Sequence, residues 1–273
     1  GARDSRPGAP LAARCWPAQR GTGATHGMLD MMGGGRVVFG GGSGYLAQSF
    51  VGYDSDPKEK RVRFNENLDI VKRLMAGETL SYQGQFSKSD KAVLNVLPHN
   101  GRVPPMYVAV LAREAAYHVG KQKNRIFTVP YASCENFEDI GTMLAEYRKG
   151  RAEAAMPADD DDHVFTLHTY VARTDEEARV QCKAAYDLYV ATRLYAKRHE
   201  YEDILANGIC LFGSVETVAK KVTRLHEMGI RHLATMHNFG GQAPELVERS
   251  MTLFAKEVMQ AVEARVGTAA AAS

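Results

Sequence analysis

The chain has 273 residues, 45% of them hydrophobic and 24% charged, with 34 Lys and Arg against 32 Asp and Glu. This length suits one α/β domain better than two small ones, and a formal net charge of +2 without a basic stripe argues against nucleic acid as a partner. No apolar run approaches the roughly 20 residues of a membrane-spanning helix, so we expect no membrane association.

The first 27 residues are rich in Gly, Ala, Pro and Arg and show no periodic apolar face. They also lack the continuous apolar segment of a secretory signal. We therefore predict a disordered or non-native arm over residues 1–27, one α/β barrel domain over 28–266, and a frayed alanine-rich tail over 267–273.

The next segment predicts a strand, a loop and a helix. The apolar run Val37–Phe39 ends at Gly40–Gly42, which indicates a buried strand followed by a tight loop. An N-capping Asp56, a first-turn proline and a capping acid precede apolar residues at helical spacing, which predicts a helix over 57–76. Alternating residues over 80–98 predict an excursion of short strands.

The rest of the chain alternates apolar strand patterns with helical ones. After residue 98 four strand patterns occur, and a helical pattern follows each of the first three. Residues 212–230 predict a capped helix ended by Gly229. A long amphipathic helix starts near 244. This alternation indicates a parallel sheet covered by helices, either doubly wound or a (β/α)8 barrel. With the strand at 37–39 we count five core strands, fewer than the eight of a closed barrel. The four later strands are predicted at 106–110, 126–131, 164–172 and just after 230.

The glycine loop is the first candidate site. Gly42, Gly44 and Ala47 have the spacing of a dinucleotide-binding turn. The residues that follow read as a polar loop rather than a helix, so a simple tight turn is the alternative. Arg61 and Arg63 follow closely, where a guanidinium can bind a phosphate ester with two hydrogen bonds; a solvated helix face is the alternative there.

Other polar residues give weaker signals. His163 and His168 lie five apart on a predicted strand and therefore point to opposite faces, which argues against a shared metal. The acidic run Asp159–Asp162 is interpreted as a charged loop tip rather than a cation site. Asn238–Gly241 ends the last strand, where parallel α/β folds build their sites, with a glycine turn and a core phenylalanine as the alternative.

The cysteines indicate the compartment. Cys15, Cys134, Cys182 and Cys210 are far apart and form no CxxC pair, which suits neither a disulfide framework nor a zinc site. We expect free thiols and a cytoplasmic location.

With these segments in place, the chain resembles the luciferase-like flavin-dependent monooxygenases, the family of bacterial luciferase. Six ordered motifs carry the resemblance, which spans roughly residues 28–260. The matching segments are 28–45, 56–75, 104–110, 168–179, 211–233 and 238–259.

The resemblance implies a TIM-type (β/α)8 barrel that binds reduced FMN and uses O2 to oxidise a small organic substrate. A flavin reductase would supply the FMN, and a homodimer or heterodimer is expected. By position, Arg61 matches the arginine that contacts the flavin phosphate, and Gly40, Gly42 and Gly44 match the loop beside the flavin. Ser43 stands where the family commonly has a further phosphate-binding arginine. The residues do not separate FMN from the deazaflavin of related enzymes, and they name neither a catalytic residue nor a metal ligand.

The front of the chain departs from the family. Members carry three β/α units before the matched region, and residues 1–27 cannot supply them. We therefore expect the barrel to lack about its first three β/α units, with weakened activity. The alternative function is that of a noncatalytic partner subunit of a luciferase-like enzyme.

Overall fold

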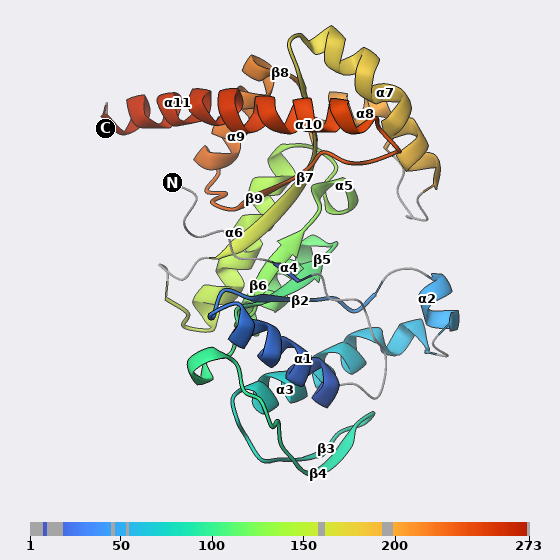
Figure 1. Ribbon diagram of the computed structural model, residues 1–273, viewed down its shortest axis with the longest axis vertical. Coiled ribbons are helices and arrows are strands. Elements are labelled where there is room, and N and C mark those ends of the chain that lie inside the picture. The colour runs from blue at the N-terminus through green and yellow to red at the C-terminus, as the bar shows by residue number, and fades with distance from the viewer. Residues whose placement is uncertain are drawn as a thin grey trace. The chain divides into compact units, whose positions relative to one another are not determined.

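The computed structural model describes residues 8–9, 19–44, 47–52, 55–157, 162–192 and 199–271 (Figure 1). The chain divides into two compact units, Gly1–Ala109 and Val110–Ser273. Strands and helices alternate in both units, as predicted. No helix in the described ranges combines the length and apolar character needed to cross a bilayer.

Unit 1 is built on parallel strands. Strand β2 (Val38–Gly41) pairs on one side with β1 (Gly8–Ala9) and on the other with β5 (Met106–Val110). The strands predicted at 37–39 and 106–110 are thereby confirmed, but β2 continues through Gly40 and Gly41, which were expected in the loop, because both pair with β5. The helical segments of this unit are α1 (Gln19–Met32), α2 (Ala47–Gly52), η1 (Pro57–Glu59) and α3 (Lys60–Met75).

Helix α1 overturns part of the predicted disordered arm, because residues 19–27 are helical. Its three glycines lower helix propensity, which hid it in the sequence. Two of them allow close packing: a Cβ on Gly27 would lie 2.9 Å from the carbonyl oxygen of Val96, and one on Gly23 would lie 3.1 Å from Cδ1 of Leu94. The helix end is fixed by Asp30, whose carboxylate accepts hydrogen bonds from the backbone N–H groups of Val37 (3.2 Å) and His99 (3.0 Å). Residues 1–7 and 10–18 of the expected arm lie outside the described residues.

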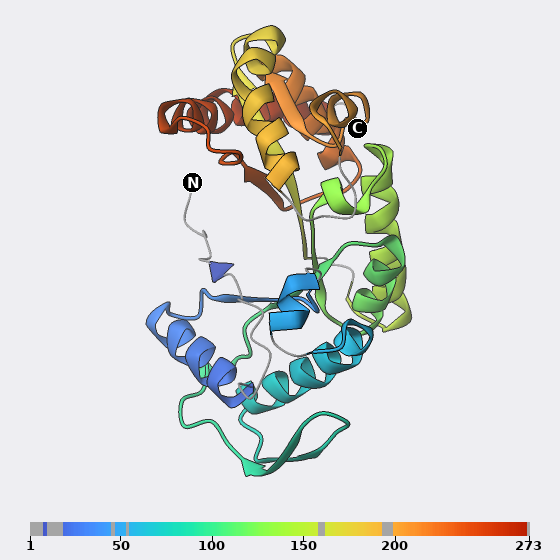
Figure 2. The same cartoon turned by 90° about the vertical axis from the view of Figure 1, so that its right-hand side faces the viewer.

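The predicted excursion after α3 is an antiparallel hairpin of β3 (Leu80–Gln83) and β4 (Lys88–Ala92), visible beyond α3 in Figure 2. The carboxylate of Glu66 on α3 accepts hydrogen bonds from the backbone N–H groups of Gln85 (2.8 Å) and Phe86 (3.1 Å) in its turn. This buried acid therefore holds the hairpin turn against α3.

Unit 2 is centred on β7 (His163–Ala172), in which every residue except Val164 is buried. It pairs in parallel with β6 (Arg125–Thr128), β9 (Leu233–Met236) and β8 (Leu211–Ser214). The long strand predicted at 164–172 is thereby confirmed, and its burial on both faces is typical of a parallel strand covered by helices.

Helices cover this sheet. In Figure 1 the last three helical segments continue as one long helix, whose middle part, η4 (Phe254–Val258), is a π-helix. The helix continues to Ala271, so the prediction of a frayed tail from 267 is wrong up to that residue, because alanine has the highest helix propensity. The helical segments are α4 (Arg113–Lys121), α5 (Pro130–Ser133), α6 (Glu138–Glu153), α7 (Asp175–Thr192), α8 (Tyr201–Ala206), α9 (Val215–Glu227), α10 (Pro244–Leu253), η4 (Phe254–Val258) and α11 (Met259–Ala271).

Three further boundaries differ from the prediction. The helix expected over 212–230 starts only at Val215, because Ser214 caps it by accepting a hydrogen bond from the N–H of Thr217 (3.2 Å), and the residues before it form β8. The strand expected over 126–131 ends at Thr128, since Pro130 begins α5. The segment after Gly44, expected as a loop, contains the short helix α2.

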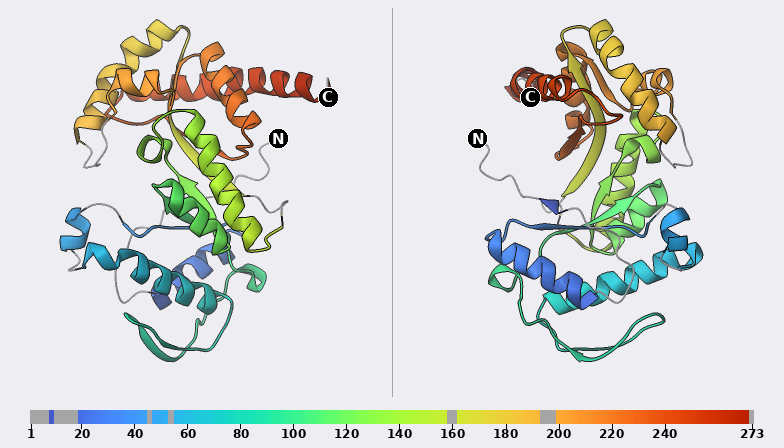
Figure 3. Two further views of the ribbon diagram at one scale, coloured as in Figure 1. Left: turned by 180° about the vertical axis from the view of Figure 1, so that it is seen from behind. Right: turned by 45° about the vertical axis from the view of Figure 1, so that its right-hand side comes forward.

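Helices α4 and α6 lie side by side in Figure 3 and meet through two glycines. A Cβ on Gly150 would overlap the carbonyl oxygen of Tyr117, and one on Gly120 would overlap that of Tyr147. The backbones therefore approach more closely than any other residue type allows.

Replacing Gly150 with alanine should lower the free energy of unfolding by about 2–4 kcal/mol, because the two helices must separate. Urea unfolding followed by circular dichroism measures the change. Gly21→Ala is the matched control: a Cβ on this helical glycine would meet nothing within 4 Å, so alanine should leave stability unchanged or raise it. Equal effects of the two substitutions would contradict the close helix contact.

Candidate functional site

The glycine loop follows β2 at the carboxyl end of the parallel strands of unit 1. Gly44 has a φ of 80°, and a Cβ there would lie 3.1 Å from Cζ of Phe50. Gly42 is similarly confined, because a Cβ on it would lie 3.2 Å from the Cβ of Ala109. The loop is therefore tight, as its sequence predicted, and glycine at position 44 is required by the backbone.

Gly40 differs from its neighbours, because a Cβ built on it meets no atom of a described residue within 4 Å. The adjacent Gly41 faces Phe64 of α3, whose Cε2 would lie 3.2 Å from a Cβ. Neither packing nor a positive φ therefore explains the glycine at position 40. The open space beside it lets a flat ligand approach the backbone directly.

The first turns of α3 lie against this loop. Phe64 packs on Gly41, and Lys60 places its Nζ 6.0 Å from the centre of the Phe50 ring, which itself contacts Gly44. Lys60 is thus a second cation close to the loop, and sequence spacing did not single it out. Its position follows from a ring contact that no local pattern reveals.

The two candidate arginines have different surroundings. Arg63 donates a hydrogen bond to Glu59 at 2.8 Å and stacks over the Phe86 ring at 3.9 Å, so its guanidinium is already engaged. Arg61 is exposed and forms no hydrogen bond or ion pair with any described residue. Of this pair, Arg61 is the one available to an anion. Ser43 lies half-buried in the loop.

The histidines on β7 belong to separate surroundings. His168 is fully buried among aromatic rings, with ring centres at 4.8 Å for Tyr189 and 5.3 Å for Tyr131. His163 is equally buried, and its Nε2 accepts a hydrogen bond from the N–H of Arg231 at 3.2 Å. In the described part of the chain no three potential ligands gather into a metal site. Of the acidic run 159–162, the first three residues lie outside the described residues.

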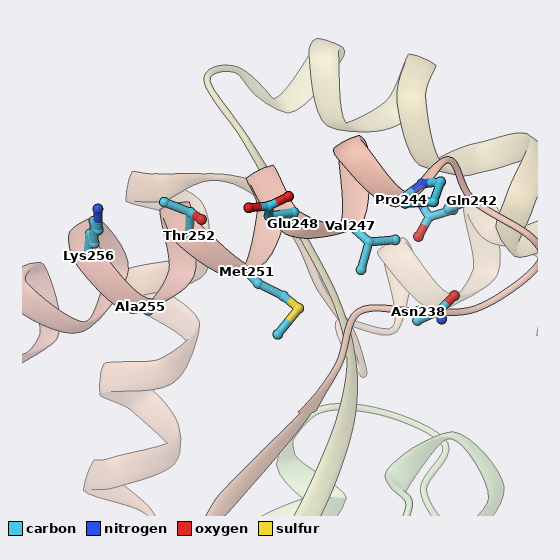
Figure 4. Close-up of a pocket in the computed structure, with 9 residues that line it drawn as sticks. All are labelled: Asn238, Gln242, Pro244, Val247, Glu248, Met251, Thr252, Ala255 and Lys256. Carbon is cyan, nitrogen blue, oxygen red and sulfur yellow. The ribbon is translucent and has the colours of Figure 1, made fainter. Parts of the chain in front are cut away.

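The segment Asn238–Gly241 divides between core and surface. Phe239 is buried in the aromatic cluster around His168, at 5.7 Å between ring centres, so the core-phenylalanine alternative holds for this residue. Asn238 is exposed and lines a groove of about 500 Å³ along α10, drawn in Figure 4. Sequence reasoning missed this groove, since its lining residues beyond Asn238 and Gln242 come from the long helix that begins at Pro244, which was predicted only as amphipathic.

A buried polar pair joins the end of β9 to α10. Nδ1 of His237 lies 2.9 Å from Oγ of Ser250, and this hydroxyl accepts a hydrogen bond from the N–H of Val171 at 2.9 Å. The Ser250 hydroxyl proton is then free to be donated to a neutral imidazole. Burial lowers the pKa of His237 to about 4.

The thiols are buried. Cys134, Cys182 and Cys210 are free, as predicted, and burial raises the pKa of Cys134 to about 11 and that of Cys182 to about 12. They are therefore protonated and poorly nucleophilic at neutral pH. Cys15 lies outside the described residues.

Comparison with known proteins relates this chain to luciferase-like enzymes and to F420-dependent ones. The model of the luciferase-like monooxygenase family matches residues 22–232. Limonene 1,2-monooxygenase of Rhodococcus erythropolis is 24% identical over 210 residues, which cover 73% of this chain and 54% of that protein. The chain thus spans about half the length of this relative. An F420-dependent glucose-6-phosphate dehydrogenase of Nakamurella multipartita is 24% identical over 254 residues, covering 88% of this chain and 72% of that one.

A solved structure shows the same fold. The oxygenating constituent of 3,6-diketocamphane monooxygenase from Pseudomonas putida, in complex with FMN, matches with a TM-score of 0.74 and 18% identity. The match covers 89% of this chain and 75% of that one. The predicted luciferase-like α/β fold is thereby confirmed.

The His237 environment predicts a pH dependence of stability. Its pKa in the folded state lies below the ordinary value of 6.5, so the unfolded chain binds a proton first and stability falls as pH drops from 6.5 towards 4. When the pH falls from 7 to 5, the titration of this residue should lower the free energy of unfolding by about 2 kcal/mol. Urea unfolding of the wild type and of His237→Asn, which keeps an acceptor for Ser250, measures the difference. Parallel pH profiles for the two proteins would show that His237 does not titrate in this way.

Proposed function

The chain belongs to the luciferase-like monooxygenase family, and from this we propose that it binds reduced FMN at the glycine loop of β2 and uses O2 to oxidise a small organic substrate. When bound, the reduced flavin supplies the two electrons with which one oxygen atom enters the substrate and the other leaves as water. The chain's own residues then have to hold the cofactor, orient it and limit the access of water.

The open space beside Gly40 is the observation that carries the proposal. Every side chain other than hydrogen would occupy this space, yet no residue in the described part of the chain does. A planar ring system can lie against the bare backbone there, since no Cβ holds it away. Gly42 and Gly44 support the same surface by keeping the turn tight.

The cations at the start of α3 suit the phosphate end of the cofactor. Arg61 is exposed and without a partner among the described residues, and Lys60 lies over Phe50 next to the loop. A guanidinium binds a phosphate ester through paired hydrogen bonds, while an ammonium adds a point charge. Ser43 would contribute a hydroxyl from the loop. We assign Gly40, Gly42, Ser43, Gly44 and Arg61 to the cofactor, with Lys60 as an added candidate.

The finer features of the proposal concern the cofactor and its supply. We propose FMN, which the 3,6-diketocamphane enzyme binds, over F420, on which the glucose-6-phosphate dehydrogenase relative depends. A flavin reductase would deliver the reduced cofactor, and dimerisation is expected. The protonated, buried thiols fit a reducing compartment such as the cytoplasm.

Anaerobic titration with reduced FMN and with reduced F420 tests the cofactor, and oxygen uptake in the presence of NADH and a flavin reductase tests the activity. Saturable binding of FMN with oxygen uptake supports the monooxygenase. FMN binding without any oxygen uptake would favour the noncatalytic partner subunit, and no binding of FMN would contradict the proposal.

Gly40→Val should weaken the binding of reduced FMN by about tenfold or more, because the branched side chain fills the space proposed for the ring. Its thermal stability should stay within about 0.5 kcal/mol of the wild type, since a Cβ meets nothing within 4 Å. Gly52→Val is the control, because Gly52 on α2 is equally open. An unchanged affinity of Gly40→Val would place the flavin elsewhere.

Arg61→Ala should weaken FMN binding by about 10- to 100-fold, the range expected for losing a charge-assisted hydrogen bond to phosphate. Riboflavin, which lacks the phosphate, should bind the wild type and this variant alike. Arg63→Ala is the matched control: it breaks the contacts with Glu59 and Phe86, so it should lower stability more than FMN affinity. If Arg61→Ala reduced FMN and riboflavin binding equally, the phosphate contact would be wrong.

A further inference from the structure

A buried amide at one end of the α10 groove has no hydrogen-bond partner among the described residues. Gln242 is half-buried as a residue, yet Nε2 and Oε1 of its side chain are both shielded from solvent, and neither is hydrogen-bonded within the described ranges. A primary amide can donate two hydrogen bonds and accept two, and it is unfavourable to leave it unpaired away from water. The amide therefore requires a partner that the described part of the chain does not supply.

The loop that carries Gln242 is held in place on both sides. Phe239 is buried in the aromatic cluster of unit 2, and Pro244 begins α10. Between them Gly240 has a φ of 62°, and a Cβ on it would overlap the carbonyl oxygen of Ala185 on α7. Only glycine permits this approach. The amide is thus presented by a fixed turn, so a ligand can bind it without first ordering the loop.

Apolar side chains lie beside the amide. Val247 and Met251 line the same groove, and Figure 4 shows both pointing to one side of α10. Met251 is 52% exposed, so its side chain is available to a ligand. The groove has a volume of about 500 Å³, which is within the range of small-molecule sites. Water can satisfy the amide but gains nothing from the apolar side chains, whereas an organic molecule satisfies both.

The charges around this end of the groove disfavour an anionic ligand. Glu245 and Glu248 are exposed and lie in the first two turns of α10, while Arg249 is already paired with Glu177 at 2.7 Å. Lys256 lines the other end of the groove, in η4. A carboxylate or phosphate beside the amide would therefore lie closer to acidic side chains than to an available cation, so a neutral ligand fits best.

We propose that this groove binds a small, neutral, largely apolar molecule with one carbonyl or hydroxyl group, which the amide of Gln242 recognises. A carbonyl accepts a hydrogen bond from Nε2, and a hydroxyl can also donate one to Oε1. The hydrocarbon part covers Val247 and Met251 and removes their surface from water. The inference goes beyond the proposed function, because it assigns a ligand to unit 2 and does not rest on flavin binding at the loop of β2.

Methyl NMR of the full chain with isotope-labelled methionine tests the site, with methyl hexyl ketone as the probe. The Met251 signal, assigned from its loss in Met251→Leu, should shift saturably with the ketone. Octanoate has a similar chain but a charge, and it should bind at least about tenfold more weakly because its carboxylate must leave water beside acidic residues. Met32 on α1 is the internal control, since it is 82% exposed and lies outside the groove. No saturable shift at Met251, an equal one at Met32, or equal binding of octanoate overturns the proposal.

Gln242→Met separates the hydrogen bond from the apolar contact, because it keeps the length of the side chain and removes the amide. The affinity for the ketone should fall about three- to tenfold, the range expected for one neutral hydrogen bond. The Tm should stay the same or rise, because an unpaired buried amide has been removed. Gln260→Met on α11 is the matched control, since it makes the same change at an exposed position outside the groove. An unchanged ketone affinity, or a lower Tm that assigns the amide to the fold, overturns the proposal.

A second variant tests the groove while the amide is kept. Val247→Trp fills the apolar part beside Gln242, so it should abolish the saturable shift of Met251. The Met32 signal and the far-ultraviolet circular dichroism spectrum should remain those of the wild type. Ketone binding that persists in Val247→Trp would place the ligand outside the groove and contradict the proposal.

Discussion

Close approach of the backbone, which only glycine permits, is the constraint on which both the packing and the proposed site depend. Gly150 lets α6 touch the backbone of α4, and Gly44 lets the loop after β2 turn with a positive φ against Phe50. In each case the space of the missing side chain is filled by the chain itself. Gly40 is different because none of the described residues fills its space. Because this glycine lies at the carboxyl end of a parallel strand, we propose that a ligand occupies the space.

The alternation of strands and helices was predictable because its signals are local. Capped helices such as α3 and α9 and long apolar strands such as β7 carry their pattern within a few turns or residues. The prediction failed where tertiary contacts overrule local preference. Helix α1 contains glycines that disfavour a helix, one of which, Gly27, fits against Val96. Strand β8 has only four residues and resembles the start of the helix that follows it.

The candidate site was predictable only in part, for a related reason. The glycine loop and the two arginines are visible in the sequence, yet Arg61 and Arg63 look equivalent there. Their difference arises from Phe86, which lies in the hairpin turn and stacks on Arg63 alone. Lys60 is likewise connected to the loop through Phe50, and the groove on α10 depends on which helix face the sheet leaves uncovered. Partners that are distant in sequence decide which charges are available.

A crystal structure of the chain grown with FMN is the most direct measurement of where the cofactor binds. The flavin ring should lie against the backbone of Gly40, with the phosphate within hydrogen-bond distance of the Arg61 guanidinium. A flavin bound away from the loop, for example in the groove of α10, or a phosphate held by Arg63 instead, would contradict the proposed site.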